Sequence, residues 1–114
     1  MVQLGYFTLD TLDIEKARAF YGALFGWRFD EAASGPTYAH VADSEPAFGF
    51  TKVERASGET NLYFRVEDIV ATCARVTDLG GKAAIPSESP TGLSCIVCDD
   101  QGFSFSLWQA AEGY

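Results

Sequence analysis

The sequence contains few of the residues that most directly bind metals, nucleic acids or membranes. It has one histidine and three cysteines, and its 8 lysines and arginines are outnumbered by 16 aspartates and glutamates, which gives a formal net charge of -8. The basic residues are scattered, so we expect neither nucleic acid nor an anionic membrane as a partner. No apolar run approaches the length of a membrane-spanning helix, and the N-terminal residues show no signal-peptide pattern. We therefore expect a cytoplasmic protein.

The three cysteines form no disulfide framework, because their number is odd and their spacing is irregular. We expect reduced thiols. Cys95 and Cys98 have a spacing seen in zinc sites, but they lie in an apolar run typical of a strand, where residues three apart point to opposite faces. We therefore expect no zinc site there, and we interpret Cys73 as a small apolar core residue of a helix.

Apolar residues, by contrast, are plentiful. Of the 114 residues 47% are hydrophobic and 14% are aromatic. This is enough apolar surface for one core, and the length leaves no room for a second domain. We predict a single domain over residues 1–114.

Two segments of the chain share one pattern. Residues 6–14, YFTLDTLDI, and residues 61–69, NLYFRVEDI, each alternate in polarity and then reach an aspartate suited to capping a helix, Asp13 or Asp68. A stretch with apolar residues three and four positions apart follows, and it ends at glycine. The sequence therefore predicts a strand, a capped helix and a helix stop, twice.

Three short strand-like runs separated by turn-forming residues follow each predicted helix. The predicted strands are residues 27–31, 37–42 and 47–53 in the first half and residues 82–85, 93–98 and 103–109 in the second. The organisation is βαβββ twice, with module one at 1–53, a polar connector at 54–60 and module two at 61–110. Because about 55 residues make only a marginal domain, the modules must pack on each other or on another chain.

Residues 13–27, DIEKARAFYGALFGW, and residues 99–109, DDQGFSFSLWQ, carry a family resemblance. Together with the doubled βαβββ unit, they make nearly the whole chain resemble the vicinal-oxygen-chelate superfamily of glyoxalases, bleomycin resistance proteins and dioxygenases. The small glyoxalase-related proteins labelled hydroxylases or lyases are the most similar group. The resemblance implies an α+β fold in which two βαβββ modules form a cupped mixed β-sheet with helices on the convex face.

In that superfamily a divalent metal is held in the cup by the first and last strands of each module. On this sequence the first-strand position, usually His, falls on Tyr6 and Asn61, and the last-strand position, usually Glu, falls on Gly49 and Ser106. None of these four residues supplies the imidazole or carboxylate that such metals prefer. We therefore predict no metal and no cofactor. We expect the single histidine, His40, on a middle strand away from these four positions.

Strand alternation predicts which other side chains face the cup. The opposite faces of the same strands are apolar, which supports this register. Aromatic rings and a few hydrogen-bonding groups on a concave surface are typical of a small-molecule site. The predicted ligand-binding residues are Tyr6, Asp10, Asn61, Tyr63, Arg65, Ser106 and Trp108.

Some of these residues have a second interpretation. Asp10 and Arg65 occupy matching positions in the two copies, so they can form a structural ion pair instead of contacting a ligand. Asp10 with Tyr6 or Tyr63 is the candidate acid–base pair if the cup catalyses a reaction without metal.

Three hypotheses of function follow. The first is a metal-free protein that binds a small, partly aromatic organic molecule, and that is a homodimer because similar proteins commonly pair modules across chains. The second is an enzyme of the superfamily, resembling lactoylglutathione lyases or hydroxylases, either metal-free or with a non-standard site. The third is an interaction module whose cup is filled by its own side chains. Ligand affinity without metal and without turnover favours the first.

Overall fold

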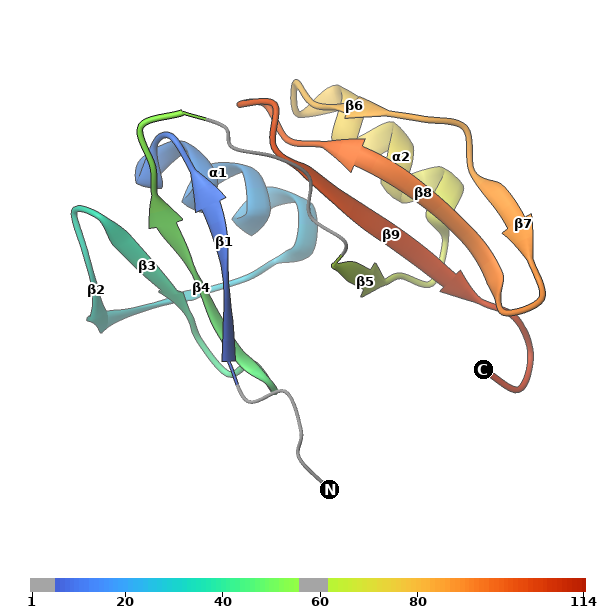
Figure 1. Ribbon diagram of the computed structural model, residues 1–114, viewed down its shortest axis with the longest axis horizontal. Helices are drawn as coiled ribbons and strands as arrows, with labels where there is room; N and C mark the ends of the chain where they lie inside the picture. The colour runs from blue at the N-terminus through green and yellow to red at the C-terminus, as the bar shows by residue number, and fades with distance from the viewer. Residues whose placement is uncertain (1–5, 56–61) are drawn as a thin grey trace. The chain divides into compact units, whose positions relative to one another are not determined.

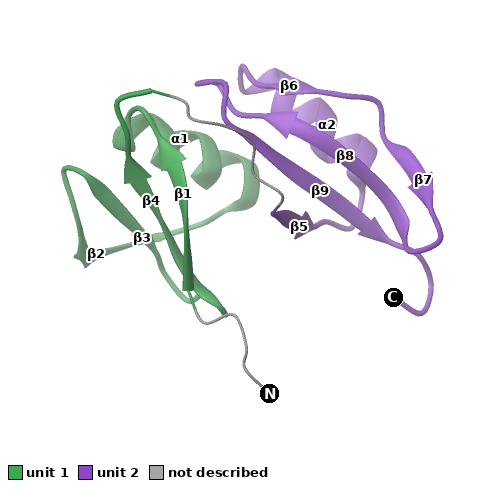
Figure 2. Ribbon diagram, in the orientation of Figure 1, with its two compact units in different colours: residues 1–56 green, residues 57–114 purple. Residues whose placement is uncertain are grey.

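The computed structural model describes residues 6–55 and 62–114 (Figure 1). The chain divides into two compact units, residues 1–56 and 57–114 (Figure 2). Most of the predicted connector, 56–60, lies outside the described residues, and so does Asn61. In the described part of the chain no helix is long and apolar enough to span a membrane.

Unit 1 is a four-stranded mixed sheet with one helix. Its sheet has the order β1-β4-β3-β2, in which β1 and β4 are parallel and the other neighbours antiparallel. The helix packs against β4 and β3. The elements are β1 (Tyr6–Thr11), α1 (Ile14–Phe25), β2 (Phe29–Gly35), β3 (Tyr38–Val41) and β4 (Ala47–Lys52).

Helix α1 begins and ends at the predicted residues. The Asp13 carboxylate accepts a hydrogen bond from the backbone N–H of Lys16, which satisfies one of the four N–H groups without a partner inside the helix. Gly26 follows the last turn with a φ of 73°, a left-handed conformation that favours glycine. The predicted apolar stripe lies against the sheet, with Ile14, Ala17, Phe20 and Tyr21 buried.

The strand after α1 begins later than predicted. Residues 27–31 were expected to form it, but β2 is Phe29–Gly35. Trp27 instead packs into the aromatic core, with ring centroids 5.6 Å from Tyr21 and 4.8 Å from Phe48. The core takes up Trp27 as the chain leaves the helix, so strand pairing starts only after it.

Unit 2 repeats this plan with a five-stranded sheet. The order is β5-β9-β8-β6, and β7 also pairs with β8; β5 and β9 are parallel and the other pairs antiparallel. Asp68 caps the helix by accepting a hydrogen bond from the backbone N–H of Ala71, as predicted. The elements are β5 (Tyr63–Arg65), α2 (Ile69–Asp78), β6 (Lys82–Ala83), β7 (Ser87–Ser89), β8 (Gly92–Cys98) and β9 (Ser104–Ala110).

Strand β7 corrects the prediction that residues 86–92 form a turn. Lys82 pairs with Cys98, and Ser87 pairs with Ser94, so five steps along one strand face four steps along β8. The extra residue is a β-bulge between β6 and β7, next to Pro86, which has no N–H to donate to a ladder. The two short strands are thus one strand position interrupted at a proline, which preserves the βαβββ plan.

Each unit buries its core between its sheet and its helix. Two thiols of unit 2 take part: the Sγ of Cys73 on α2 lies 3.6 Å from the Sγ of Cys95 on β8. Cys98 lies on the other face, with its Sγ 3.8 Å from the hydroxyl of Ser104, so the predicted opposite orientation of Cys95 and Cys98 is confirmed. Cys73 is half-buried, less than a full core residue. The largest fully buried side chains are Phe50 in unit 1 and Phe105, Ile69, Leu107, Val76 and Val97 in unit 2.

Candidate functional site

The face of the unit 1 sheet away from α1 carries two of the predicted site residues. Tyr6 is exposed and Asp10 half-buried, while Leu9 and Thr11 on the alternate positions of β1 are buried. This alternation agrees with the predicted register of β1.

On this face two phenol groups meet over a glycine. The Oη atoms of Tyr6 and Tyr38 are 2.5 Å apart. In the sheet register their partners on β4 lie on either side of Gly49. A Cβ atom on Gly49 would collide with the Tyr38 phenol and with the backbone oxygen of Ala39. The absence of a side chain on Gly49 therefore leaves the space that the Tyr38 ring occupies.

His40 belongs to the same group of side chains, so the prediction that it lies away from the superfamily's ligand positions is wrong. Strand β3 places His40 directly opposite Gly49. Its Nδ1 is 2.7 Å from the Tyr38 Oη, and its ring is stacked with that of Tyr6 at a centroid distance of 6.4 Å. The pairing of β3 with β4 produces this contact, and the prediction did not include that pairing.

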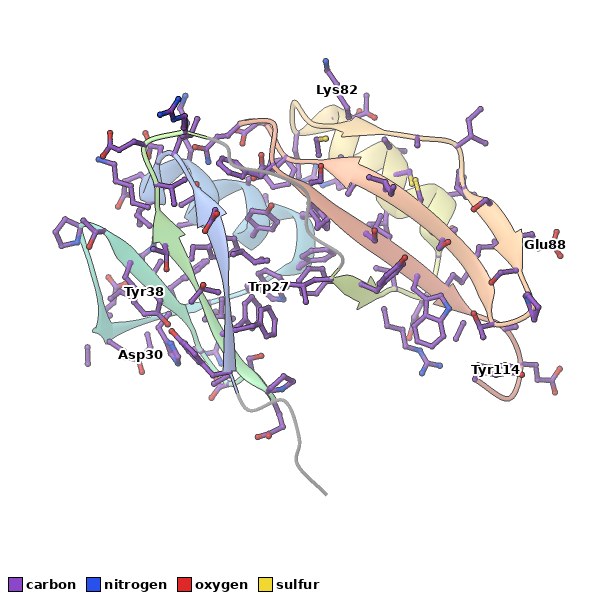
Figure 3. All side chains as sticks on the ribbon, in the orientation of Figure 1. Trp27, Asp30, Tyr38, Lys82, Glu88 and Tyr114 are labelled. Carbon is purple, nitrogen blue, oxygen red and sulfur yellow. The ribbon has the colours of Figure 1, made fainter. Side chains whose placement is uncertain are left out.

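Sequence reasoning missed Tyr38 as well as His40. The available signal was Gly49, because a glycine inside a strand often marks the close approach of another group. Tyr38 extends from β3 in unit 1 (Figure 3). Burial raises the pKa of Tyr38 to about 12, with a contribution from its hydrogen bond to Tyr6, so the phenol is protonated at neutral pH and can donate a hydrogen bond.

In unit 2 the sheet brings four predicted site residues together. Tyr63 pairs with Ser106 and Arg65 pairs with Trp108, on the parallel strands β5 and β9. Their exposure differs: Tyr63 is 61% exposed, whereas Ser106 is only 4% exposed. Ser106 therefore offers little surface to a ligand in this structure.

A hollow of about 330 Å³ opens on unit 2. It is within the size range of small-molecule sites, which begins at about 300 Å³. Two predicted residues and three that sequence reasoning missed line the hollow: Tyr63, Trp108, Ser89, Thr91 and Ser94. Ser89 belongs to β7, which was predicted as a turn, and this error hid its position beside β8.

Neighbouring contacts fix the indole ring at the hollow. Trp108 donates from Nε1 to the backbone oxygen of Thr91 at 3.2 Å. The Arg65 guanidinium lies 5.3 Å from the centroid of the indole, a cation–π contact, and donates to the backbone oxygen of Tyr114 at 3.3 Å. Arg65 thus brings a positive charge next to an aromatic wall. The predicted ion pair between Asp10 and Arg65 would join the two units and stays a prediction.

The family model described as a glyoxalase-like domain matches residues 6–108 of this chain. The chain belongs to this glyoxalase-like family. A solved glyoxalase/bleomycin resistance protein/dioxygenase family enzyme from Burkholderia phytofirmans has a similar fold, with a TM-score of 0.80 at 20% identity over 96% of this chain and 100% of that one. A bleomycin-binding protein of Streptomyces verticillus, solved with copper(II)-bleomycin, has a TM-score of 0.69 at 19% identity over 97% and 100% of the two chains. The predicted α+β fold and superfamily are confirmed.

Two curated relatives are longer than this glyoxalase-like chain. The anthracycline biosynthesis protein DnrV of Streptomyces peucetius is 32% identical over 97% of the chain, and CFP32 of Mycobacterium bovis is 27% identical over 90% of it. The chain spans 42% of the length of DnrV and 43% of that of CFP32.

The superfamily implies a divalent metal, and the residues that we matched to its ligand positions in the described part of the chain do not fit one. Tyr6 supplies a phenol group, Gly49 supplies no donor, and the Tyr38 ring fills the space where a side chain of residue 49 would begin. Divalent transition metals prefer imidazole, thiolate and carboxylate donors. Within residues 6–55 and 62–114 no group of three His, Cys, Asp or Glu converges.

Proposed function

We propose that this glyoxalase-like protein binds a small, partly aromatic organic molecule without the aid of a metal. The observation that carries the proposal is the hollow of about 330 Å³ on unit 2, with Tyr63 and Trp108 in its lining. Aromatic rings contribute a large contact area with little loss of side-chain freedom, and the hydroxyl groups of Ser89, Thr91 and Ser94 can orient a polar substituent.

Charge restricts the ligand further. The chain carries a formal net charge of -8, which repels anions at long range. Arg65 supplies a local positive charge beside the Trp108 ring. An uncharged aromatic molecule with hydroxyl or carbonyl groups is compatible with both the negative net charge of the chain and the local positive charge of Arg65.

The proposal includes the expectations of a homodimer and of a cytoplasmic location, which rest on the sequence. A second candidate function is a metal-free enzyme of the superfamily, of the lyase or hydroxylase kind. The hydrogen-bonded group of Tyr6, Tyr38 and His40 favours that candidate, because phenol and imidazole groups are the components of acid–base catalysis.

The first test is a thermal-shift titration of the chelator-treated protein. One series uses Ni²⁺, Zn²⁺, Mn²⁺ and Fe²⁺, and the other a panel of aromatic hydroxy and keto compounds, including antibiotics. A ligand that binds only the folded state raises the melting temperature as its concentration exceeds its Kd. We expect stabilisation by aromatic compounds. Stabilisation by a metal alone, at a stoichiometric concentration, would instead support the hypothesis of a metalloenzyme.

Tyr63→Ala then locates the site. For a compound that binds the wild type, we expect about a 5-fold higher Kd, because loss of one aromatic stack costs about 1 kcal/mol. Tyr114→Ala is the matched control, since both side chains are 61% exposed and only Tyr63 lines the hollow. Equal Kd values for the two variants, measured by calorimetry, would place binding elsewhere.

A further inference from the structure

Tyr6, Tyr38 and His40 form a continuous hydrogen-bonded chain on unit 1, apart from the residues that line the hollow. The two links measure 2.5 Å between phenol oxygens and 2.7 Å from the Tyr38 Oη to the His40 Nδ1. Tyr6 is 50% exposed, whereas Tyr38 and His40 are half-buried. The chain therefore joins an imidazole to a hydroxyl group that a ligand can reach.

Each of the two hydrogen bonds contains one proton, so the donors and acceptors along the three side chains can be arranged in two ways. When Nδ1 of His40 lacks a proton, Tyr38 donates to it and Tyr6 donates to Tyr38. When Nδ1 carries a proton, it donates to Tyr38, and Tyr38 donates to Tyr6. The O–H of Tyr6 is then available to a ligand. Burial raises the pKa of Tyr38 to about 12, so Tyr38 transmits a proton and does not hold a negative charge at neutral pH.

We propose that Tyr6, Tyr38 and His40 are a proton relay that binds the oxygen of a phenol or enol at Tyr6. When the ligand binds, its O–H gives its proton to Tyr6, Tyr6 gives its own proton to Tyr38, and Tyr38 gives its own proton to the unprotonated Nδ1 of His40. The net change is one proton transferred from the ligand to the imidazole, which leaves an imidazolium at His40 and a ligand oxyanion that accepts a hydrogen bond from Tyr6, with no oxidation or reduction. The proposal rests on the proposed function, because it needs a small organic ligand.

The charged residues around the relay favour a weakly acidic, uncharged ligand over an anionic one. Strands β1, β3 and β4 contain one lysine or arginine, Lys52. By strand alternation it lies on the face of the sheet opposite to the relay. Two carboxylates share the face of the relay: Asp10 on β1 and Asp30, which pairs with His40 across β2 and β3. Arg18 and Arg28 are held in ion pairs with Glu31 and Asp43. A carboxylate or phosphate would meet repulsion here, whereas a phenol or enol is neutral until it meets the relay.

His40 is the single histidine of the chain, so its imidazole nitrogen-15 signals are identified without assignment. The probe is 4-nitrophenol, whose absorbance reports its ionisation. Titration of the labelled wild type with the neutral form of 4-nitrophenol should move the Nδ1 signal towards its protonated position and increase the absorbance of nitrophenolate. Tyr38→Phe should abolish this response, because it removes the central link. Tyr6→Phe should raise the Kd of the probe about 10-fold or more, the usual effect of losing a hydrogen bond to a charged group.

Tyr114→Phe is the control, because its hydroxyl belongs to neither site, and it should keep both the Nδ1 response and the wild-type Kd. An Nδ1 response that persists in Tyr38→Phe, or binding with no Nδ1 response in the wild type, would overturn the relay and leave the proposed function intact. Failure of the probe to bind also overturns the relay. The proposed function fails only if the whole aromatic panel fails to stabilise the protein. Tyr6→Phe gives a second variant that keeps the Tyr38–His40 bond, should Tyr38→Phe not fold.

Discussion

At the scale of single residues, Gly49 decides what the unit 1 face contains. We matched it to the position where the superfamily usually has a Glu ligand, and its missing side chain makes room for a phenol ring from the neighbouring strand. Glycine at this position therefore both lacks a metal donor and leaves room for Tyr38.

Gly49→Ala should lower the free energy of unfolding by about 1–3 kcal/mol, the usual cost of forcing extra atoms into a packed region. The cost should fall in a Tyr38→Ala background but remain above zero, because the backbone oxygen of Ala39 is also in the way. Urea unfolding of the four proteins measures this coupling.

Gly22→Ala is the control for that experiment. A Cβ at Gly22 would meet its nearest neighbour, the backbone oxygen of Trp27, at an ordinary 3.5 Å. Because alanine favours helix, this variant should gain on the order of 1 kcal/mol. A neutral Gly49→Ala would show that both the Tyr38 ring and the backbone at Ala39 move aside without cost, and would contradict this prediction.

The sequence predicted individual site residues only where strand alternation was sufficient. Tyr63 and Trp108 line the hollow, and alternation along their own strands identified both as cup-facing. Tyr38 and His40 escaped because their roles depend on which residues of β3 lie opposite Gly49. That pairing is a long-range property, and a strand of four residues gives little sign of it.

At the scale of elements, local chemistry was a reliable guide to the helices. Asp13 and Asp68 cap α1 and α2 as predicted, since capping depends on a few neighbouring residues. The strand after each helix was less predictable. Trp27 was predicted to begin a strand, but it packs in the core and β2 begins later. Residues 86–92 were interpreted as a turn, although the chain resumes strand pairing there after a bulge.

Asp68→Ala should lower the free energy of unfolding by about 1 kcal/mol, because the backbone N–H of Ala71 loses its partner. Asp78→Ala, at the other end of α2, should be neutral or slightly stabilising, since a negative charge opposes the helix dipole there. Chemical unfolding followed by circular dichroism compares the two. A cost as large for Asp78→Ala would indicate a general charge effect and no role for the cap.

At the scale of the whole molecule, two protonated groups link stability to pH. Burial raises the pKa of Cys73 from 9.0 to about 11, assisted by its hydrogen bond to Cys95, and burial likewise raises that of Tyr38 from 10.0 to about 12. At a pH between the ordinary and the raised pKa of either group, the folded protein keeps a proton that the unfolded chain has released. Stability contributed by both groups is therefore complete below about pH 9 and declines as the pH rises to about 12.

The free energy of unfolding should accordingly fall between pH 9 and pH 11 in the wild type, and fall less steeply in Cys73→Ser, which lacks the titrating thiol. Urea unfolding at a series of pH values under reducing conditions measures both slopes. Cys98→Ser serves as the comparison, because that thiol is on the other face of β8. Identical slopes for wild type and Cys73→Ser would contradict the link between thiol burial and stability.

The bulge beside Pro86 also bears on how copies of this protein avoid one another. Strands β6 and β7 occupy an edge of the unit 2 sheet and contain only two and three residues. A long, regular edge is a template for a strand from another molecule, and prolines and bulges are common protections against this. Here the register changes between the two short strands, so an added strand would lose its alignment after a few hydrogen bonds. Fibril-like growth from this edge is therefore disfavoured, even where the protein is concentrated.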